Sequence, residues 1–259
     1  MRFSEKLIVA NWKMNPATLR EARALFRRIA RASVPARAEI VLALPALYLA
    51  PVALRAKTRR ISFAAQDVFP GTIGSHTGEI SAPMLASVGA RASIVGHSER
   101  RALGETDEAV ARKVEAALGA GLSVILCIGE KERDVQGTYL AYIDGQIRSA
   151  LAHVVRAQLA QVVIAYEPIW AIGKSAEHAM KPHDVHQMVV FVRKTLTALF
   201  GAPAARRVRV LYGGSVEVEN AEALVRDGEV DGLLVGHASL DHASFRGIVD
   251  AVARAARRA

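Results

Sequence analysis

A carboxylate closes one of the most apolar segments of the chain. Residues 162–167 read VVIAYE, and Glu167 is followed by the apolar stretch PIWAIG, which ends at Gly173. An apolar cover that removes water from a carboxylate costs stability, but it suits an acid or base that works in a dry site. The pattern therefore predicts that Glu167 is a catalytic group beneath a flap.

Polar residues also follow the first apolar run, KLIVAN. Asn11 and Lys13 are two positions apart, so on an extended chain they point to the same side. A lysine at the end of a buried run is costly unless it meets an anion. Taken alone, Lys13 is equally well explained as a lysine whose ammonium group reaches solvent.

The fourth apolar run continues into VGHSERR, which contains His97, Ser98 and Glu99. A helix expected to start at Thr106 would place its positive end nearby and disfavour a charged imidazole. We therefore expect His97 to be neutral and able to donate a hydrogen bond. Glu99 and Arg101 are expected to form a supporting ion pair.

Small residues follow the last two apolar runs. The segment YGGSV contains Ser215, and the segment VGHAS contains Gly236 and His237. Small residues before a helix expose backbone N–H groups, which bind phosphate and other anions. The two segments together predict an anion site, although GGS alone would be explained by a turn.

One carboxylate, one neutral histidine, one lysine and an anion site suit proton abstraction next to a carbonyl group. Glu167 would be the base, and His97 and Lys13 would hold the enediol oxygens. The flap would exclude water, because enediol phosphates readily eliminate phosphate in water. We expect no metal, since His178, His183 and His186 do not form a ligand motif.

Eight short, almost continuously apolar runs alternate with helical patterns. Such runs are typical of parallel strands covered on both faces, and eight strand–helix units predict a closed α/β (β/α)₈ barrel. An open doubly wound sheet is the alternative, but the first turn lacks its glycine motif. The expected strands are 6–11, 39–44, 61–66, 92–96, 123–129, 162–167, 208–213 and 232–236. The expected helices are 17–33, 46–56, 81–88, 106–119, 139–155, 182–199, 217–227 and 238–257.

Composition fits one barrel domain over residues 1–259. The chain is 51% hydrophobic and has one cysteine, Cys127, which excludes an internal disulfide and favours a reducing cytoplasm. No segment resembles a signal peptide or a membrane span. The net charge of +9 is spread along the helices and aromatic residues make up only 5%, so we do not expect nucleic-acid binding.

The residues and their order resemble the triosephosphate isomerase family along the whole chain. The segments that carry the resemblance are ANWKMN, TGEIS, VGHSERR, CIGE, AYEPIWAIG, YGGSV and LLVGHASL. The resemblance implies interconversion of dihydroxyacetone phosphate and D-glyceraldehyde 3-phosphate without a cofactor. It implies that Glu167 is the base and His97 the electrophile, and that Lys13 and Asn11 bind substrate and stabilise charge. It further implies phosphate binding by Gly173, Ser215, Gly236 and His237, with Ser98 and Glu99 in supporting positions.

The same resemblance implies a homodimer in which the loop at residues 67–79 brings Thr77 to the partner's active site. An ordinary long surface loop is the other interpretation.

Two positions depart from the family pattern. The flap continues as AIGKSAEHAMKP, which changes its second hinge at Lys174 and Ser175, and His237 stands where the family has a second glycine. A side chain at position 237 would be strained if that residue needed a positive φ. These departures keep open an isomerase of a four-carbon ketose phosphate, and a non-catalytic barrel scaffold is the alternative from another class.

Overall fold

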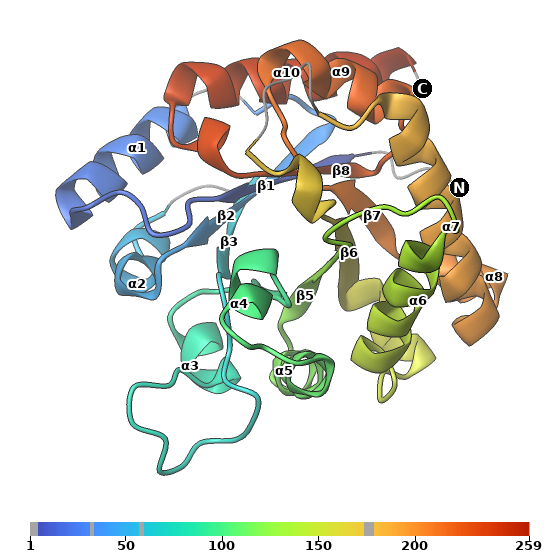
Figure 1. Cartoon of the computed structure of the whole chain (residues 1–259). Coiled ribbons are helices and arrows are strands. Elements are labelled where there is room, and N and C mark those ends of the chain that lie inside the picture. Colours follow the sequence, from blue (N-terminus) through green and yellow to red (C-terminus); the bar gives the residue numbers. More distant parts are fainter. Residues whose placement is uncertain (1–4, 32–33, 57–59, 174–178, 259) are drawn as a thin grey trace.

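Each strand of the structure pairs in parallel with the next, and β8 pairs with β1, so the sheet closes into an eight-stranded barrel (Figure 1). The structure is a computed structural model that describes residues 5–31, 34–56, 60–173 and 179–258. The strands are β1 Lys6–Asn11, β2 Ala38–Leu44, β3 Ile61–Ala65, β4 Ala92–Val95, β5 Ser123–Ile128, β6 Val162–Tyr166, β7 Arg209–Tyr212 and β8 Gly232–Val235.

Helices surround the barrel on its outside (Figure 1). The α-helices are α1 Leu19–Arg31, α2 Ala46–Ala53, α3 Ala82–Ser87, α4 Ser98–Ala102, α5 Asp107–Gly119, α6 Thr138–Ala150, α7 Pro182–Phe200, α8 Ala202–Ala205, α9 Val218–Arg226 and α10 His242–Arg258. Short 3₁₀ helices are η1 Arg156–Gln161, η2 Ile169–Ala171 and η4 His237–Ser239. The predicted (β/α)₈ barrel is confirmed. No helix in the described ranges is long and apolar enough to cross a membrane.

The strands are apolar at almost every position because each strand packs against two apolar cores, one inside the barrel and one between the barrel and the helices. Alternate residues such as Leu7, Val9 and Ala43 fill the inside of the barrel. The residues between them, such as Ile8 and Ala10, pack outward against the helices. Because side chains alternate along a strand, the inward row of β1 ends in Asn11. The inward row of β6 passes through Ala165 and points at Glu167 in the same way.

Six strands end one residue before the predicted position. The residues just beyond these strand ends are Gln66, Gly96, Gly129, Glu167, Gly213 and Gly236. All six lie at the carboxyl end of the barrel, where the chain turns away from the strand direction to form the rim. At Gly96 this turn uses a φ of 72°, which glycine adopts readily.

The helix predicted at 139–155 is too long, because α6 ends at Ala150 and the separate η1 begins at Arg156. The helix predicted at 238–257 divides into η4 and α10. The Ser244 N–H donates to Asp241 Oδ2 at 2.8 Å, which fixes a new helix start after η4. Helices α4 and α8 are too short to give a periodic signal and were not predicted.

Candidate active site

The carboxyl ends of the strands surround a cavity of about 230 Å³. Eight of the predicted residues line it: Asn11, Lys13, His97, Glu167, Gly173, Ser215, Gly236 and His237. They come from the end of β1 and from the segments that follow β1, β4, β6, β7 and β8, so only the closed barrel brings them together. The other two predicted residues, Ser98 and Glu99, contact Glu167 and Lys13 at the edge of this group.

A hydrogen bond fixes the backbone of Glu167, and the Glu167 side chain is buried. Its N–H donates to Ile128 O at 2.7 Å, which continues the β5–β6 ladder, and its side chain is 4% exposed. Oε1 lies 3.3 Å from His97 Nε2, and Oε2 accepts a hydrogen bond from the Ser98 N–H at 3.4 Å. A β-carbon at Gly213 would lie only 2.9 Å from Glu167 Cγ, so the glycine after β7 makes room for this side chain.

The hydrogen bonds around His97 define a neutral imidazole. Nδ1 accepts the Glu99 N–H at 3.2 Å, so Nδ1 carries no proton. The proton of the neutral ring is then on Nε2, which lies 3.3 Å from Glu167 Oε1. The helix that His97 caps is α4, which starts at the next residue, whereas the sequence pointed to the helix after Thr106. The expected helix terminus is therefore closer than predicted.

Lys13 is held in a strained conformation beside the cavity. Its φ is +50°, which is uncommon for a residue with a side chain. Asn11 Oδ1 accepts the Lys13 N–H at 3.0 Å, and Gln66 Nε2 donates to Lys13 O at 2.9 Å. These two side chains hold the backbone of Lys13 from both sides, so Asn11 positions Lys13 in addition to lining the cavity.

The predicted Glu99–Arg101 ion pair is wrong. Glu99 Oε1 instead lies 2.5 Å from Lys13 Nζ, and the Arg101 guanidinium bonds Asp107 Oδ1 at 2.6 Å. The turn of α4 directs the two side chains to different partners. Glu99 therefore lies beside the ammonium group of Lys13 at the mouth of the cavity, with its side chain 59% exposed.

The predicted anion site contains small residues and backbone turns. Ser215 Oγ donates to Ala171 O at 2.9 Å, which links the segment after β7 to the flap. His237 begins η4 and is exposed at the cavity. It is not among the described residues with a positive φ, so the strain considered for a side chain at this position does not arise. Gly173, with φ 71°, ends the described part of the flap.

The first half of the flap is anchored by residues that sequence reasoning left without a role. The buried Glu130 carboxylate accepts hydrogen bonds from Trp170 Nε1 at 3.0 Å and Tyr166 Oη at 2.8 Å. Arg133 Nε donates to the same carboxylate at 2.8 Å, and its guanidinium lies over the Trp170 ring. Glu130 follows β5 as Glu167 follows β6, so its position just after an apolar strand is the sequence signal that indicates a rim residue. The altered hinge at Lys174 and Ser175 lies outside the described residues.

Burial also controls the ionisation of two groups on the strands β5 and β7. It raises the pKa of the Cys127 thiol, and the negative charge of Glu167 raises this pKa further. Burial likewise raises the pKa of Tyr212 to about 12. Both groups therefore stay protonated at neutral pH.

Within the described ranges, no group of three histidine, cysteine or acidic side chains is arranged to hold a metal ion. The cavity combines a carboxylate, an imidazole and an ammonium group with the small residues of the predicted anion site. This combination on a (β/α)₈ barrel defines a class of enzyme that moves protons on small anionic substrates.

Comparison with known proteins gives the family within this class. The family model for triosephosphate isomerase matches residues 6–252, and the chain belongs to this family. Triosephosphate isomerase from Rubrobacter xylanophilus is 43% identical over 95% of this chain and 96% of the relative. The proteins of the same name from Chloroflexus aurantiacus and Flavobacterium johnsoniae are 42% and 37% identical and are covered over 97% and 99% of their lengths.

Proposed function

We propose that this chain interconverts dihydroxyacetone phosphate and D-glyceraldehyde 3-phosphate, with Glu167 as the base. The observation that carries the proposal is the 3.3 Å contact between Glu167 Oε1 and His97 Nε2 inside a cavity that also contains Lys13. A carboxylate beside a neutral ring N–H provides both a base and a hydrogen-bond donor for one enediol.

The reaction would move one proton between neighbouring carbons. The Glu167 carboxylate removes a proton from the carbon beside the carbonyl group, and the carbonyl oxygen gains the electron pair. The Nε2–H of His97 and the ammonium group of Lys13 stabilise this oxygen. Glu167 then returns the proton to the adjacent carbon. In the structure its carboxylate contacts His97 and the Ser98 N–H, so it exchanges these contacts for the substrate.

The phosphate would bind at the opposite side of the cavity. Ser215 and the backbone at Gly236 and His237 line this side, and Gly173 lies at the end of the described flap. The hydrogen bond from Ser215 Oγ to Ala171 O supports a flap that responds to phosphate binding, because one residue contacts both parts. A closed flap would protect the enediol phosphate from loss of phosphate to water.

A coupled assay with D-glyceraldehyde 3-phosphate tests the proposal. Glu167→Asp withdraws the carboxylate by one methylene, so we expect a folded protein that has lost most of its kcat. Glu115→Asp, at an exposed position on α5, is the matched control and should retain full activity. Unchanged activity in the Glu167 variant would reject this residue as the base.

Two further measurements address the alternatives. A higher kcat/KM for a tetrose phosphate than for the triose phosphate would overturn the substrate assignment. A scaffold without activity would show neither turnover nor tight binding of a planar phosphate that imitates the enediolate, which an isomerase binds far more tightly than its substrate.

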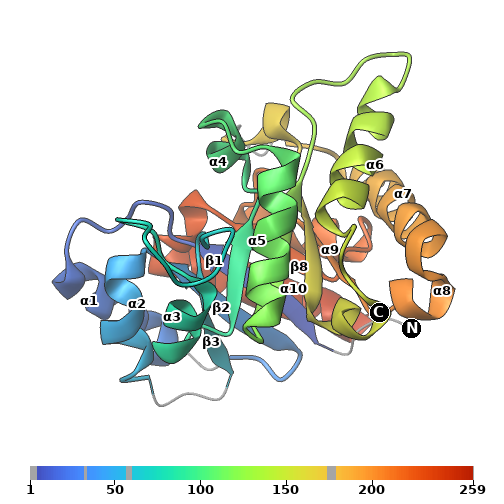
Figure 2. The ribbon, with the colours of Figure 1, turned by 90° about the horizontal axis from the view of Figure 1, so that it is seen from below.

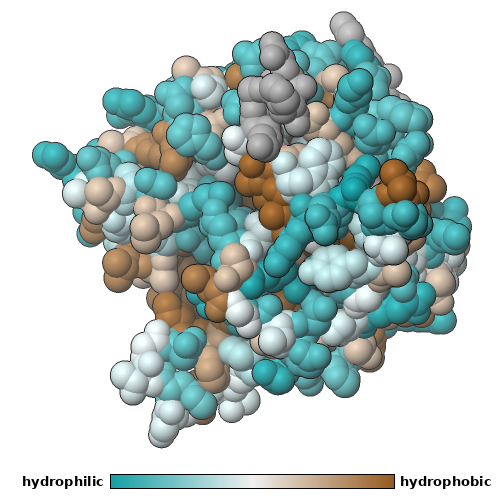
Figure 3. All heavy atoms as spheres, in the orientation of Figure 1, coloured by the Kyte–Doolittle hydropathy of each residue, from teal (hydrophilic) through white to brown (hydrophobic). Residues whose placement is uncertain are grey.

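We also propose that two copies of the chain associate through one side of the barrel rim. Exposed apolar side chains lie there on segments near α2 and α3, where Figure 3 shows apolar atoms at the surface. We call the following residues the rim patch: Met14, Leu47, Ile73 and Met84, whose exposures are 94%, 84%, 74% and 52%. The loop at 67–79, which contains Ile73 of this patch and Thr77, extends away from the barrel next to α3 (Figure 1). Exposed apolar side chains gathered on one face are typical of an association surface. A cytoplasmic location stays a prediction that rests on the single cysteine.

A further inference from the structure

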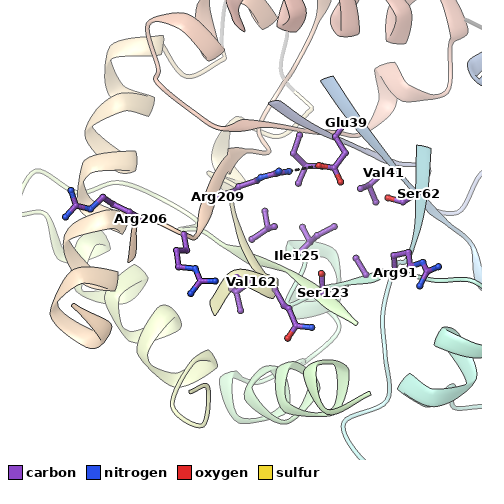
Figure 4. Close-up of a pocket in the computed structure, with 15 residues that line it drawn as sticks. Glu39, Val41, Ser62, Arg91, Ser123, Ile125, Val162, Arg206 and Arg209 are labelled. Atoms are coloured by element: carbon purple, nitrogen blue, oxygen red, sulfur yellow. Dashed lines mark hydrogen bonds and ion pairs between the residues drawn. The ribbon is translucent and has the colours of Figure 1, made fainter. Parts of the chain in front are cut away.

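A second, larger cavity of about 610 Å³ opens at the amino ends of the strands (Figure 4). The inward rows of the strands separate it from the active site. Leu7 lines this cavity and Asn11 lines the other one, and four residues of strand span about 13 Å. In Figure 2, α4 marks the end with the active site and α8 lies toward the opposite end. The two cavities are therefore separate.

The inner wall of this lower cavity is apolar and carries a few polar groups. Leu7, Val41 and Ile125 belong to the barrel interior and form the apolar part. Ser62 on β3 and Ser123 on β5 add hydroxyl groups. An apolar wall with a few polar groups, in a volume of this size, is typical of cavities that bind small organic molecules.

The opening of the lower cavity is strongly basic. Four of its lining residues are arginines, Arg91, Arg206, Arg207 and Arg209, and one is a glutamate, Glu39. Arg209 Nη1 lies 2.8 Å from Glu39 Oε2, and Figure 4 shows the two side chains pointing toward each other across the opening. This pair neutralises one of the four arginines, so three positive charges remain.

The three remaining guanidinium groups have different surroundings. Arg206 Nε donates to Ala202 O at 3.3 Å, and its side chain points away from the cavity in Figure 4. Arg91 and Arg207 are exposed, and no described residue forms an ion pair or a hydrogen bond with either side chain. Arg91 extends outward in Figure 4. Both side chains are long enough to turn toward a ligand in the opening without breaking a hydrogen bond or an ion pair.

We propose that the lower cavity binds an organic polyphosphate with an apolar or aromatic body, of the nucleoside diphosphate or triphosphate class. Guanidinium groups match phosphate oxygens in pairs, and charge of one sign at the mouth of a low-dielectric cavity concentrates anions there. The apolar wall formed by Leu7, Val41 and Ile125 would receive the base. The cavity has more than twice the volume of the active-site cavity, which suits a ligand larger than a triose phosphate.

Isothermal titration with ATP in the presence of EDTA tests the proposal. The active site is first saturated with 2-phosphoglycolate, so that only other phosphate sites respond. We expect saturable binding of one ATP per chain that weakens as salt is added. The double variant Arg91→Ser, Arg207→Ser should bind ATP about tenfold more weakly or worse, because it loses two charge-assisted contacts.

Matched variants distinguish ATP binding in the lower cavity from nonspecific binding of ATP to a basic protein. Arg20→Ser, Arg28→Ser on α1 removes the same charge from exposed positions outside the cavity and should leave ATP binding unchanged. The double variant Arg91→Lys, Arg207→Lys keeps the charge and loses the planar fork, so we expect intermediate affinity. All variants should keep the wild-type melting temperature and isomerase activity.

Simpler ligands test the two parts of the proposed class. Adenosine should bind weakly, because it lacks the phosphates, and tripolyphosphate should bind less tightly than ATP, because it lacks the apolar body. Equal binding of tripolyphosphate and ATP would overturn the assignment of an organic ligand. No saturable ATP binding, or equal loss in the α1 and cavity variants, would overturn the site itself.

Discussion

At the scale of single residues, the site depends on which nitrogen of His97 carries a proton. The Glu99 N–H occupies Nδ1, so the neutral ring can only donate from Nε2, and Nε2 faces Glu167. A charged imidazole would need a proton on Nδ1, which would oppose the Glu99 N–H at 3.2 Å. The start of α4 therefore favours the neutral form of His97, which in the proposed mechanism donates to a substrate oxygen and leaves the charge of Glu167 intact.

Replacing His97 tests this role. His97→Gln keeps a polar side chain but removes the ring whose orientation the Glu99 N–H fixes. We expect kcat for the triose phosphate to fall by about 10²-fold or more, the size of an acid–base contribution. Steady-state kinetics measure the effect, and the melting temperature checks that the variant is folded.

His153→Gln is the matched control, because His153 is exposed on the segment between α6 and η1. It should keep wild-type kcat. A folded His97→Gln variant with kcat within about twofold of wild type would contradict the proposed role of the ring.

The sequence predicted the four polar residues at the rim. It did not predict the side chains that hold these four residues in position. Asn11, Lys13, His97 and Glu167 each follow an apolar run, which is a local signal. The role of Gln66 was not predicted from the sequence. Its side chain donates hydrogen bonds to Lys13 O and Ala43 O, which are 53 and 23 positions away in the chain. The partner of Glu99 was predicted wrongly for the same reason, since spacing along a turn does not show which distant cation is nearer.

At the scale of elements, the strands position the site residues because the inward-facing row of each strand continues into the rim. Asn11, Glu167 and Gly213 are each two residues beyond an inward-facing apolar residue, namely Val9, Ala165 and Leu211. A rim residue therefore points over the barrel axis without any special turn. Where the inward rows of two strands meet at the rim, one of the two residues must be small. Gly213 has no side chain, and the Glu167 side chain occupies the space beside it.

Gly213→Ala is expected to displace the base while keeping the barrel. The new β-carbon would meet Glu167 Cγ at 2.9 Å, so the carboxylate must move by a few tenths of an ångström or more. Misplaced catalytic groups cost up to about 10²-fold in rate, and we expect a loss of kcat approaching that size. The coupled isomerase assay and a crystal structure of the variant measure the rate and the displacement.

Gly145→Ala is the control substitution for this experiment. Gly145 lies on the exposed side of α6 with no neighbouring atom within 4 Å of a new β-carbon. The added methyl group should leave kcat unchanged and raise stability by about 0.5–1 kcal/mol, since glycine is unfavourable inside a helix. Equal kcat values in both glycine variants would show that Gly213 does not set the position of Glu167.

The barrel itself was predictable, because eight apolar runs separated by helical patterns admit few other architectures. Element boundaries were less predictable where the chain changes direction for tertiary reasons. Strand ends at the rim were placed one residue late, because apolar character continues past the last ladder hydrogen bond at positions such as Gly96 and Gly236. The division after α6 gives no periodic signal, because Leu151 and Val154 remain apolar and buried after the helix has ended.

At the scale of the whole molecule, the proposed association surface lies next to the strained lysine. Met14 follows Lys13 directly and is 94% exposed, so one side of this segment has only solvent to hold it. On the other side, Asn11 and Gln66 hold the Lys13 backbone. A second copy that covers the rim patch would restrain Lys13 from outside, which would couple association to activity.

Ile73→Asp tests this coupling. Ile73 is 74% exposed on the loop at 67–79, so a charge there should not disturb the fold of the isolated chain. Buried in a contact between two copies, the same carboxylate would have no partner and would oppose association. Sedimentation velocity at micromolar protein should then show a dimer for the wild type and a monomer for the variant, with a loss of kcat in the monomer.

Val190→Asp supplies the comparison, because Val190 is 53% exposed on α7, away from the rim patch. It adds the same charge to an exposed apolar position and should leave both the dimer and kcat intact. A wild-type chain that sediments as a fully active monomer would refute the association outright. A monomeric Ile73 variant with undiminished kcat would show instead that Asn11 and Gln66 alone suffice to hold Lys13 in its working conformation.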